Sequence, residues 1–141
     1  MRPTIPLILF GWVLTGAAGL LHAAEPTSPA AFLAAFTAEA QQHDGSFRPD
    51  AVRGAQFYRN RFAHNEKMPS CSSCHTPDPT QTGKHVVTGK TIAPLSPKAN
   101  PERFTDAAKV NKWLTRNCKE VVGRECTALE KADLLAFLLN P

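Results

Sequence analysis

The sequence predicts a single all-α domain of about four helices, and three observations support this prediction. Apolar residues recur at helical spacing in four separate segments, which is the pattern of helices that bury one face. Ser, Thr or Asp stands at the start of each segment, where its side chain can cap a helix. No segment shows the apolar–polar alternation that is typical of a strand.

Residues 1–24 are expected to form a secretory signal peptide. Arg2 precedes an apolar run over 5–21, and small residues follow at Ala23 and Ala24. This is the order of a positive region, a hydrophobic region and a cleavage zone. A membrane anchor is the alternative, but the run is shorter than the ~20 residues of a spanning helix. We therefore expect export, in a bacterium to the periplasm, where disulfides persist, with no membrane anchor after cleavage.

Residues 25–141 are expected to form one domain, since a chain of about 117 residues holds a single core. Without Arg2, 15 of the 16 Lys and Arg residues remain against 12 Asp and Glu, a formal charge of +3. The excess is small, and the basic residues are scattered rather than clustered. We therefore expect no nucleic-acid partner.

The first two helices are predicted from their caps. Ser28-Pro29 is an N-cap followed by proline at the first helical position, and Gly45 predicts an end near residue 43. The second helix is expected to begin near Asp50. Its Gly54 would let another helix approach closely.

Two further helices follow an irregular segment that contains Pro94, Pro97 and Pro101. The third helix is expected to begin at Thr105-Asp106. Its Val110, Trp113, Leu114 and Asn117 are spaced i, i+3, i+4 and i+7, which places Asn117 on the inward face. A capping box over 127–130 predicts the start of the last helix.

Residues 71–75 read C-S-S-C-H, the attachment motif of a c-type haem. Two thiols can add across the vinyl groups of one porphyrin, and the histidine can coordinate its iron. A redox C-x-x-C pair would need a βαβ pattern, and a zinc site would need a second ligand pair at short spacing. Neither is present, so we expect one covalent haem c held by Cys71, Cys74 and His75.

The order of elements is similar to that of class I cytochromes c. A helix leads directly into the motif, a loop would wrap the haem edge, and two helices follow. In that fold the helix before the motif crosses the terminal helix. Here the crossing would place Gly54 and Phe57 against Leu134, Phe137 and Leu138.

The sixth ligand of the iron is not the usual methionine. Met68 is the only methionine after residue 24, and it lies too close before Cys71 to reach the opposite haem face. Other donors that the chain offers are His43, His64, His85, Lys84, Lys90, Lys98, Asn117 and the thiols of Cys118 and Cys126 if these are free.

Two of these donors are the main alternatives. His85 is the strongest conventional ligand, because imidazole binds both ferric and ferrous iron, although it can equally be a solvated loop residue. Asn117 can be a ligand, an inward amide bonded to backbone, or a helix cap. Cys118 and Cys126 can form a disulfide after export, or remain two buried thiols.

Short stretches along nearly the whole chain after residue 24 match those of one known family. They are Ser-Pro-Ala at 28–30, Arg-Gly-Ala at 53–55, 69–75, Thr-Gly-Lys at 88–90, Ile-Ala-Pro-Leu at 92–95, Arg-Phe-Thr-Asp at 103–106 and much of 110–138. Arg-Asn-Cys at 116–118 and Arg-Glu-Cys-Thr at 124–127 are the specific blocks. The chain therefore resembles the monohaem oxygen-binding cytochromes c known as the sphaeroides haem protein family.

This resemblance implies a ligand set and partners. An asparagine that precedes a disulfide cysteine is the sixth ligand of ferric iron in that family, which corresponds to Asn117 with a Cys118–Cys126 bridge. The amide leaves on reduction, and the ferrous iron then binds O2, NO or CO. A dihaem cytochrome c and a membrane cytochrome b are the implied redox partners.

Four further residues are expected to contact the haem: Trp113 beside the iron, Lys90 and Arg103 near the propionates, and Pro94, whose carbonyl would accept from the His75 ring. The favoured function is electron transfer with gas binding by the ferrous protein. A six-coordinate electron carrier with His85 as ligand is the alternative, as is an O2, NO or peroxide reductase. A dedicated enzyme is disfavoured, because no distal histidine can be assigned.

Overall fold

The computed structural model describes residues 24–141. The predicted signal peptide lies outside the described residues except for Ala24. Helices and strands follow in the order α1 (Pro29–Gln41), α2 (Ala51–Arg59), α3 (Ser72–His75), β1 (Gly83–Lys84), β2 (Thr91–Ile92), α4 (Ala107–Val121) and α5 (Ala128–Leu139). None of the helices within this part of the chain has the length and apolar character needed to cross a membrane.

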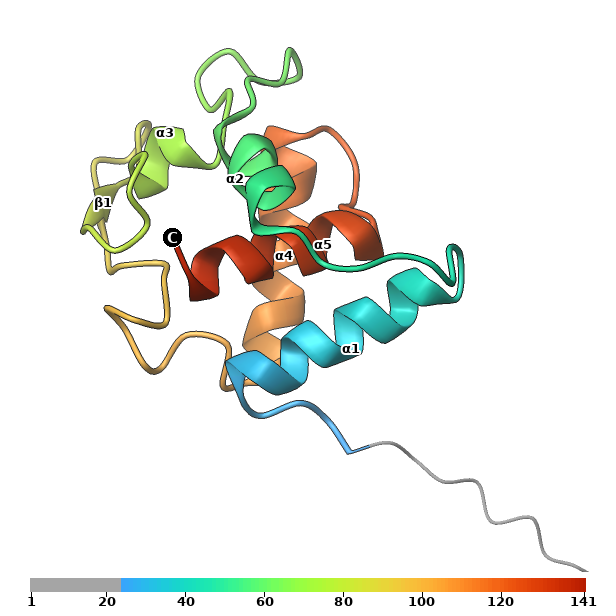
Figure 1. The fold of residues 1–141 in the computed structure, drawn as a ribbon. Coiled ribbons are helices and arrows are strands. Elements are labelled where there is room, and N and C mark those ends of the chain that lie inside the picture. Colours follow the sequence, from blue (N-terminus) through green and yellow to red (C-terminus); the bar gives the residue numbers. More distant parts are fainter. Residues whose placement is uncertain (1–23) are drawn as a thin grey trace, which may run out of the picture.

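Helix α5 lies at the centre of the molecule. It packs against α1 and α2, while α4 crosses behind it (Figure 1). The core is formed mainly by aromatic and aliphatic side chains of these helices, among them Phe32, Tyr58, Leu135 and Leu138. The all-α prediction is therefore confirmed.

The four long helices begin where their caps predicted. The side chains of Ser28, Asp50 and Asp106 each accept a backbone N–H of the first turn. Thr127 and Glu130 form the reciprocal bonds of a capping box. These starts depend on contacts between residues two or three positions apart, so the local sequence is sufficient to predict them.

Two predictions at the level of elements were wrong in detail. The first helix ends at Gln41 rather than near residue 43. The haem motif, for which no element was predicted, forms a helical turn of its own, α3. The central segment is not wholly irregular. Its β1 and β2 pair antiparallel, and a turn at His85–Gly89 closes the hairpin with a 2.8 Å bond from the Gly89 N–H to the His85 carbonyl. Strands of two residues are too short to show alternation.

The predicted crossing of α2 and α5 is confirmed at Gly54. A side-chain carbon at this position would overlap the Asp133 carbonyl and lie 3.0 Å from Cβ of Phe137. Tyr58, rather than Phe57, is the fully buried aromatic residue of α2, and its ring centroid lies 5.4 Å from that of Phe137. Phe57 is half-buried.

Gly54→Ala should destabilise the protein by about 1–3 kcal/mol, because a methyl group there forces α2 and α5 apart. Urea unfolding of the holoprotein measures the loss. Gly45→Ala is the matched control, since nothing lies within 4 Å of a side-chain carbon at Gly45. Equal stability of the two variants would contradict close packing at this crossing.

Glu130 makes the free energy of unfolding depend on pH in the acid range. Burial raises its pKa, but the Arg124 guanidinium and the Thr127 N–H outweigh that effect and hold the pKa of Glu130 below its ordinary value of 4.5. A lowered folded-state pKa stabilises the protein above the unfolded value, and this contribution is lost as pH falls through the folded value.

Unfolding of the wild type should therefore become easier below about pH 4.5 to a greater extent than unfolding of Glu130→Gln, which carries no carboxylate to protonate. Chemical denaturation at a series of pH values measures the difference. Glu39→Gln makes the same chemical change at an exposed site on α1 and serves as the control for the substitution itself. Parallel profiles for the wild type and Glu130→Gln would refute the expectation.

Candidate haem-binding site

The attachment motif is a single helical turn held by serine hydroxyls. The Ser70 hydroxyl accepts the Ser73 N–H at 3.1 Å and lies 3.0 and 2.7 Å from the hydroxyls of Ser72 and Ser73. The Cys71 carbonyl accepts the N–H groups of Cys74 and His75. The local sequence therefore places both thiols and the imidazole on one turn.

Tyr58 fixes the end of this turn from α2. Its buried hydroxyl donates to the carbonyls of His75 and Thr76 at 3.1 and 2.7 Å. Burial raises the pKa of Tyr58, so the hydroxyl keeps its proton and remains a donor. On the other side, Gly83 of β1 lies directly against the Cys74 carbonyl, where a larger residue would clash.

The electrostatic surroundings favour neutral donors in the motif. Burial lowers the pKa of His75 to about 4, with smaller contributions from the charges of Arg103 and His85. Burial also raises the pKa of the Cys71 thiol to about 11. The imidazole is therefore neutral, which is the form that binds a metal. Neither Cys71 nor Cys74 is in a disulfide.

Arg103 and Pro94 lie together beside the motif. The Arg103 guanidinium donates to the Pro94 carbonyl at 2.9 Å and to the Ala93 carbonyl at 2.7 Å. Partial burial lowers the pKa of Arg103. The positive charge of Arg103 in turn helps to lower the pKa of His75. The sequence predicted both residues as haem contacts but not the bond between them.

Lys90, the remaining predicted haem contact of this loop, and His85, the alternative iron ligand, both lie on the hairpin of β1 and β2. Lys90 is exposed. His85 is half-buried, and its ring Nδ1 accepts the N–H groups of Val87 and Thr88 at 3.2 and 3.3 Å. These two bonds give His85 a structural role in the turn.

Asn117 lies on α4 and is half-buried. The helix continues to Val121 and is capped at Val122, so Asn117 is not its cap. Within residues 24–141 its side chain makes no hydrogen bond to backbone, and since no fully buried side-chain nitrogen or oxygen there lacks a partner, its amide is accessible to solvent. Trp113, one turn earlier, is 47% exposed and lies between Lys112 and Arg116, each 5.6 Å from its ring centroid.

The disulfide between Cys118 and Cys126 is confirmed, with 5.6 Å between their Cα atoms. It joins α4, directly after Asn117, to the residue before the capping box of α5. The end of α4 is thereby tied to the central helix.

These residues fit a covalent haem. Two free thiols and a neutral imidazole occur on one turn, and half-buried apolar side chains of Leu95, Phe104 and Leu114 pack against the hydrophobic core. Within the described chain, no group of three or more His, Cys, Asp or Glu side chains is assembled that could hold a metal ion on its own. Fold and donor set together define a c-type cytochrome.

The comparisons with known proteins agree. Residues 44–138 match a family described as "Domain of unknown function (DUF1924)". The chain is 50% identical over 113 residues to cytochrome c-type protein SHP of Cereibacter sphaeroides, which covers 79% of this chain and 83% of that protein. It is 41% identical over 93 residues to cytochrome c'' of Methylophilus methylotrophus, covering 65% of each.

Solved structures of the same relatives superpose on this fold. Oxidized SHP, described as an oxygen-binding cytochrome c, has a TM-score of 0.72 at 47% identity and covers 80% of this chain and 96% of its own. The solution structure of M. methylotrophus cytochrome c'' has a TM-score of 0.69 at 34% identity, with 80% and 93% covered. The chain belongs to the family of SHP and cytochrome c'', and it carries one covalently bound haem c.

Sequence reasoning missed two residues that shape this site. Tyr58 was not singled out from the sequence, although a buried tyrosine needs a partner for its hydroxyl, and that need was an available signal. Asp133 lies on the buried face of α5 among leucines. A carboxylate at such a position must be paired, but the sequence does not show its partner.

Tyr58→Phe should destabilise the holoprotein by about 1–3 kcal/mol, because the carbonyls of His75 and Thr76 lose their donor while the ring stays. Urea unfolding followed by far-UV circular dichroism measures the change. Unchanged stability would mean that solvent replaces the hydroxyl without loss and that Tyr58 does not hold the motif.

Proposed function

We propose that this protein is an exported, periplasmic cytochrome c that takes up electrons and binds small diatomic ligands in its reduced state. The observation that carries the proposal is Asn117. The residue is half-buried, its amide makes no hydrogen bond within residues 24–141, and the next residue is held by a disulfide. An accessible amide with no protein partner, on a tethered part of the helix, is free to act as a ligand.

Cys71 and Cys74 would attach the haem, and His75 would be the proximal ligand. Pro94 and Arg103 support that side. The Pro94 carbonyl accepts from Arg103 at 2.9 Å and from the Asn100 amide at 3.4 Å, so a bond from the His75 ring would have to replace the longer one, from Asn100. Fixing the proximal ring in this way would set how strongly it binds.

Arg103, Lys90 and Trp113 would make the remaining contacts with the haem. The Arg103 guanidinium and, from the hairpin, Lys90 are the cations available to the propionates. Trp113 contributes an aromatic face one turn before Asn117.

When bound, the haem iron supplies a one-electron couple and one further coordination position. The carboxamide oxygen of Asn117 is a weak, neutral donor that suits the harder ferric ion and competes poorly for ferrous iron. Asn117 would therefore hold the ferric form, and its release on reduction would leave room for O2, NO or CO. The released amide has two N–H donors that can bond a polar ligand there.

Two properties of the relatives support the proposal. SHP is described as an oxygen-binding cytochrome c, and the cytochrome c'' structure is described as giving insight into haem-ligand detachment. We propose the same combination for this chain, with a dihaem cytochrome c and a membrane cytochrome b as redox partners.

The first test is the optical spectrum of the ferrous protein with and without carbon monoxide. A five-coordinate, high-spin ferrous spectrum that shifts at once on adding carbon monoxide is expected, because Asn117 has left. In the ferric state, Asn117→Ala should raise the high-spin fraction.

His85→Ala is the matched control and should leave both spectra unchanged. A sharp low-spin ferrous spectrum that carbon monoxide does not alter would overturn gas binding. Loss of that low-spin spectrum in His85→Ala would then identify a six-coordinate electron carrier with His85 as its ligand.

A further inference from the structure

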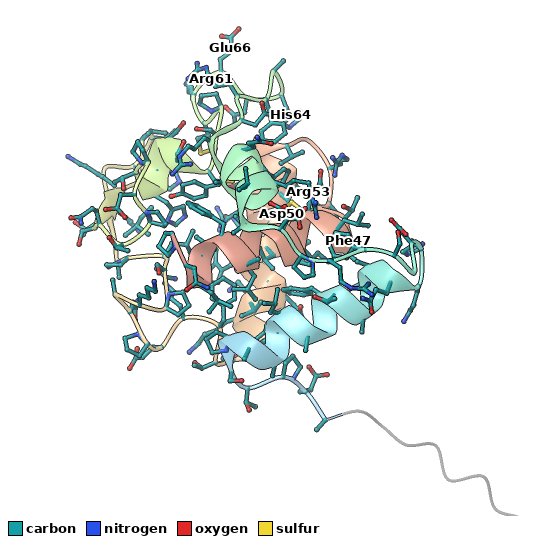
Figure 2. All side chains as sticks on the ribbon, in the orientation of Figure 1. Phe47, Asp50, Arg53, Arg61, His64 and Glu66 are labelled. Carbon is teal, nitrogen blue, oxygen red and sulfur yellow. A yellow bond between two sulfur atoms is a disulfide. The ribbon has the colours of Figure 1, made fainter. Side chains whose placement is uncertain are left out.

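The loop between α2 and the haem motif contacts the far end of the helix that carries Asn117. This loop, residues 61–69, is closed at its neck by a 2.7 Å bond from the Phe62 N–H to the Pro69 carbonyl. Two residues later the chain reaches Cys71. Figure 2 shows Arg61, His64 and Glu66 on this loop, at the end of the molecule where α2 and the last turn of α4 lie.

Asn65 links this loop to α4 through its side-chain amide. The oxygen accepts the N–H groups of Lys67 and Met68 at 3.1 and 3.2 Å, which shapes the loop. The nitrogen donates to the Glu120 carbonyl at 3.2 Å. Glu120 is in the last turn of α4, where carbonyls have no partner within the helix.

His64 makes a second contact with the same end of α4. Gly123 follows the helix with φ +86°, and a side-chain carbon built on it would lie 2.8 Å from Cγ and Nδ1 of the His64 ring. The ring therefore packs directly on the Gly123 backbone, and no side chain larger than hydrogen fits between them.

The end of α4 is thus held from two sides. The Cys118–Cys126 disulfide ties it to α5, and the 61–69 loop ties it to the segment that precedes Cys71. In contrast, the most extensive helix packing joins α5 to α1 and α2, not to α4. Glu120 lies three residues after Asn117, one helical turn away, so a shift of this turn moves Asn117.

We propose that Asn65 is a positioning residue for the sixth ligand: its bond to the Glu120 carbonyl sets where α4 holds Asn117 relative to the haem attached at Cys71 and Cys74. This inference rests on the proposed function, since it acts through Asn117. The bond contributes because it satisfies a carbonyl of the helix end and joins the segment that leads to the haem-attaching cysteines to the helix that carries Asn117.

The decisive variant is Asn65→Asp. A carboxylate keeps the acceptor for Lys67 and Met68 but loses the donor to Glu120. The high-spin to low-spin ratio of the ferric holoprotein should rise about 2- to 10-fold, the change in equilibrium expected for one net hydrogen bond. Asn65→Ser, which adds no charge and is too short to reach Glu120, should shift the ratio in the same direction.

Asn60→Asp is the matched control, because it makes the same chemical change at an exposed asparagine that ends α2. It should leave the ferric spectrum unchanged. Hydrogen exchange in the last turn of α4 should become faster in Asn65→Asp and not in Asn60→Asp.

A double-mutant cycle with Asn117→Ala separates positioning from a general effect on folding. In that background Asn65→Asp should cause no further spectral change. The inference is overturned if Asn65→Asp leaves the wild-type spectrum unaltered, or if it alters the spectrum equally when Asn117 is absent. If Asn117→Ala itself changes nothing, the proposed ligand fails, and the inference fails with it for that separate reason.

Discussion

The crossing of α2 over α5 is the constraint on which the site depends. Gly54 lets the two backbones meet, and Asp133 locks them together. The Asp133 carboxylate accepts the Asp50 N–H at 2.7 Å and the Arg53 guanidinium at 2.8 and 2.9 Å. A buried carboxylate is costly unless it is fully bonded, and here it is bonded (Figure 2 shows Asp50 and Arg53 together at the start of α2). With α2 fixed at this end, Tyr58 at the other end determines where the haem motif lies.

What the sequence could predict follows from the range of each interaction. Caps at Ser28, Asp50 and Thr127 depend on neighbouring residues, and the motif carries its chemistry in five consecutive positions, so both were accessible. The Asp133 contact joins residues 83 positions apart, and the Tyr58 bonds join positions 17 and 18 apart. Their partners are set by how helices cross, which residue spacing does not encode. Within the loop, Pro94 and Arg103 were identified singly, but their mutual bond required the folded chain.

Asn117 shows how the structure narrows a set of alternatives. The sequence left it as a ligand, a backbone-bonded amide or a helix cap. Because α4 continues past it to Val121 and its side chain has no bond within residues 24–141, neither structural role accounts for it. His85, in contrast, already has a structural role, because its ring accepts two N–H groups of its own turn. The residue without a role in the fold is the better candidate for a role at the iron.

The two sides of the proposed site are held with unequal strength, and this asymmetry has a functional consequence. His75 is fixed by Tyr58, by the close approach of Gly83 and by a turn closed with serine hydroxyls. Asn117 lies near the end of α4, which is tied down by a disulfide, by the Asn65 amide and by the His64 ring on Gly123, while Val110 anchors an earlier turn of the helix in the core. A ligand can leave only if the protein on its side tolerates a change in position, and a ligand that must return needs a tether. If His75 and Asn117 are the two ligands, as proposed, a strong donor on the rigid side and a weak donor on a tethered helix would direct any change of coordination to Asn117.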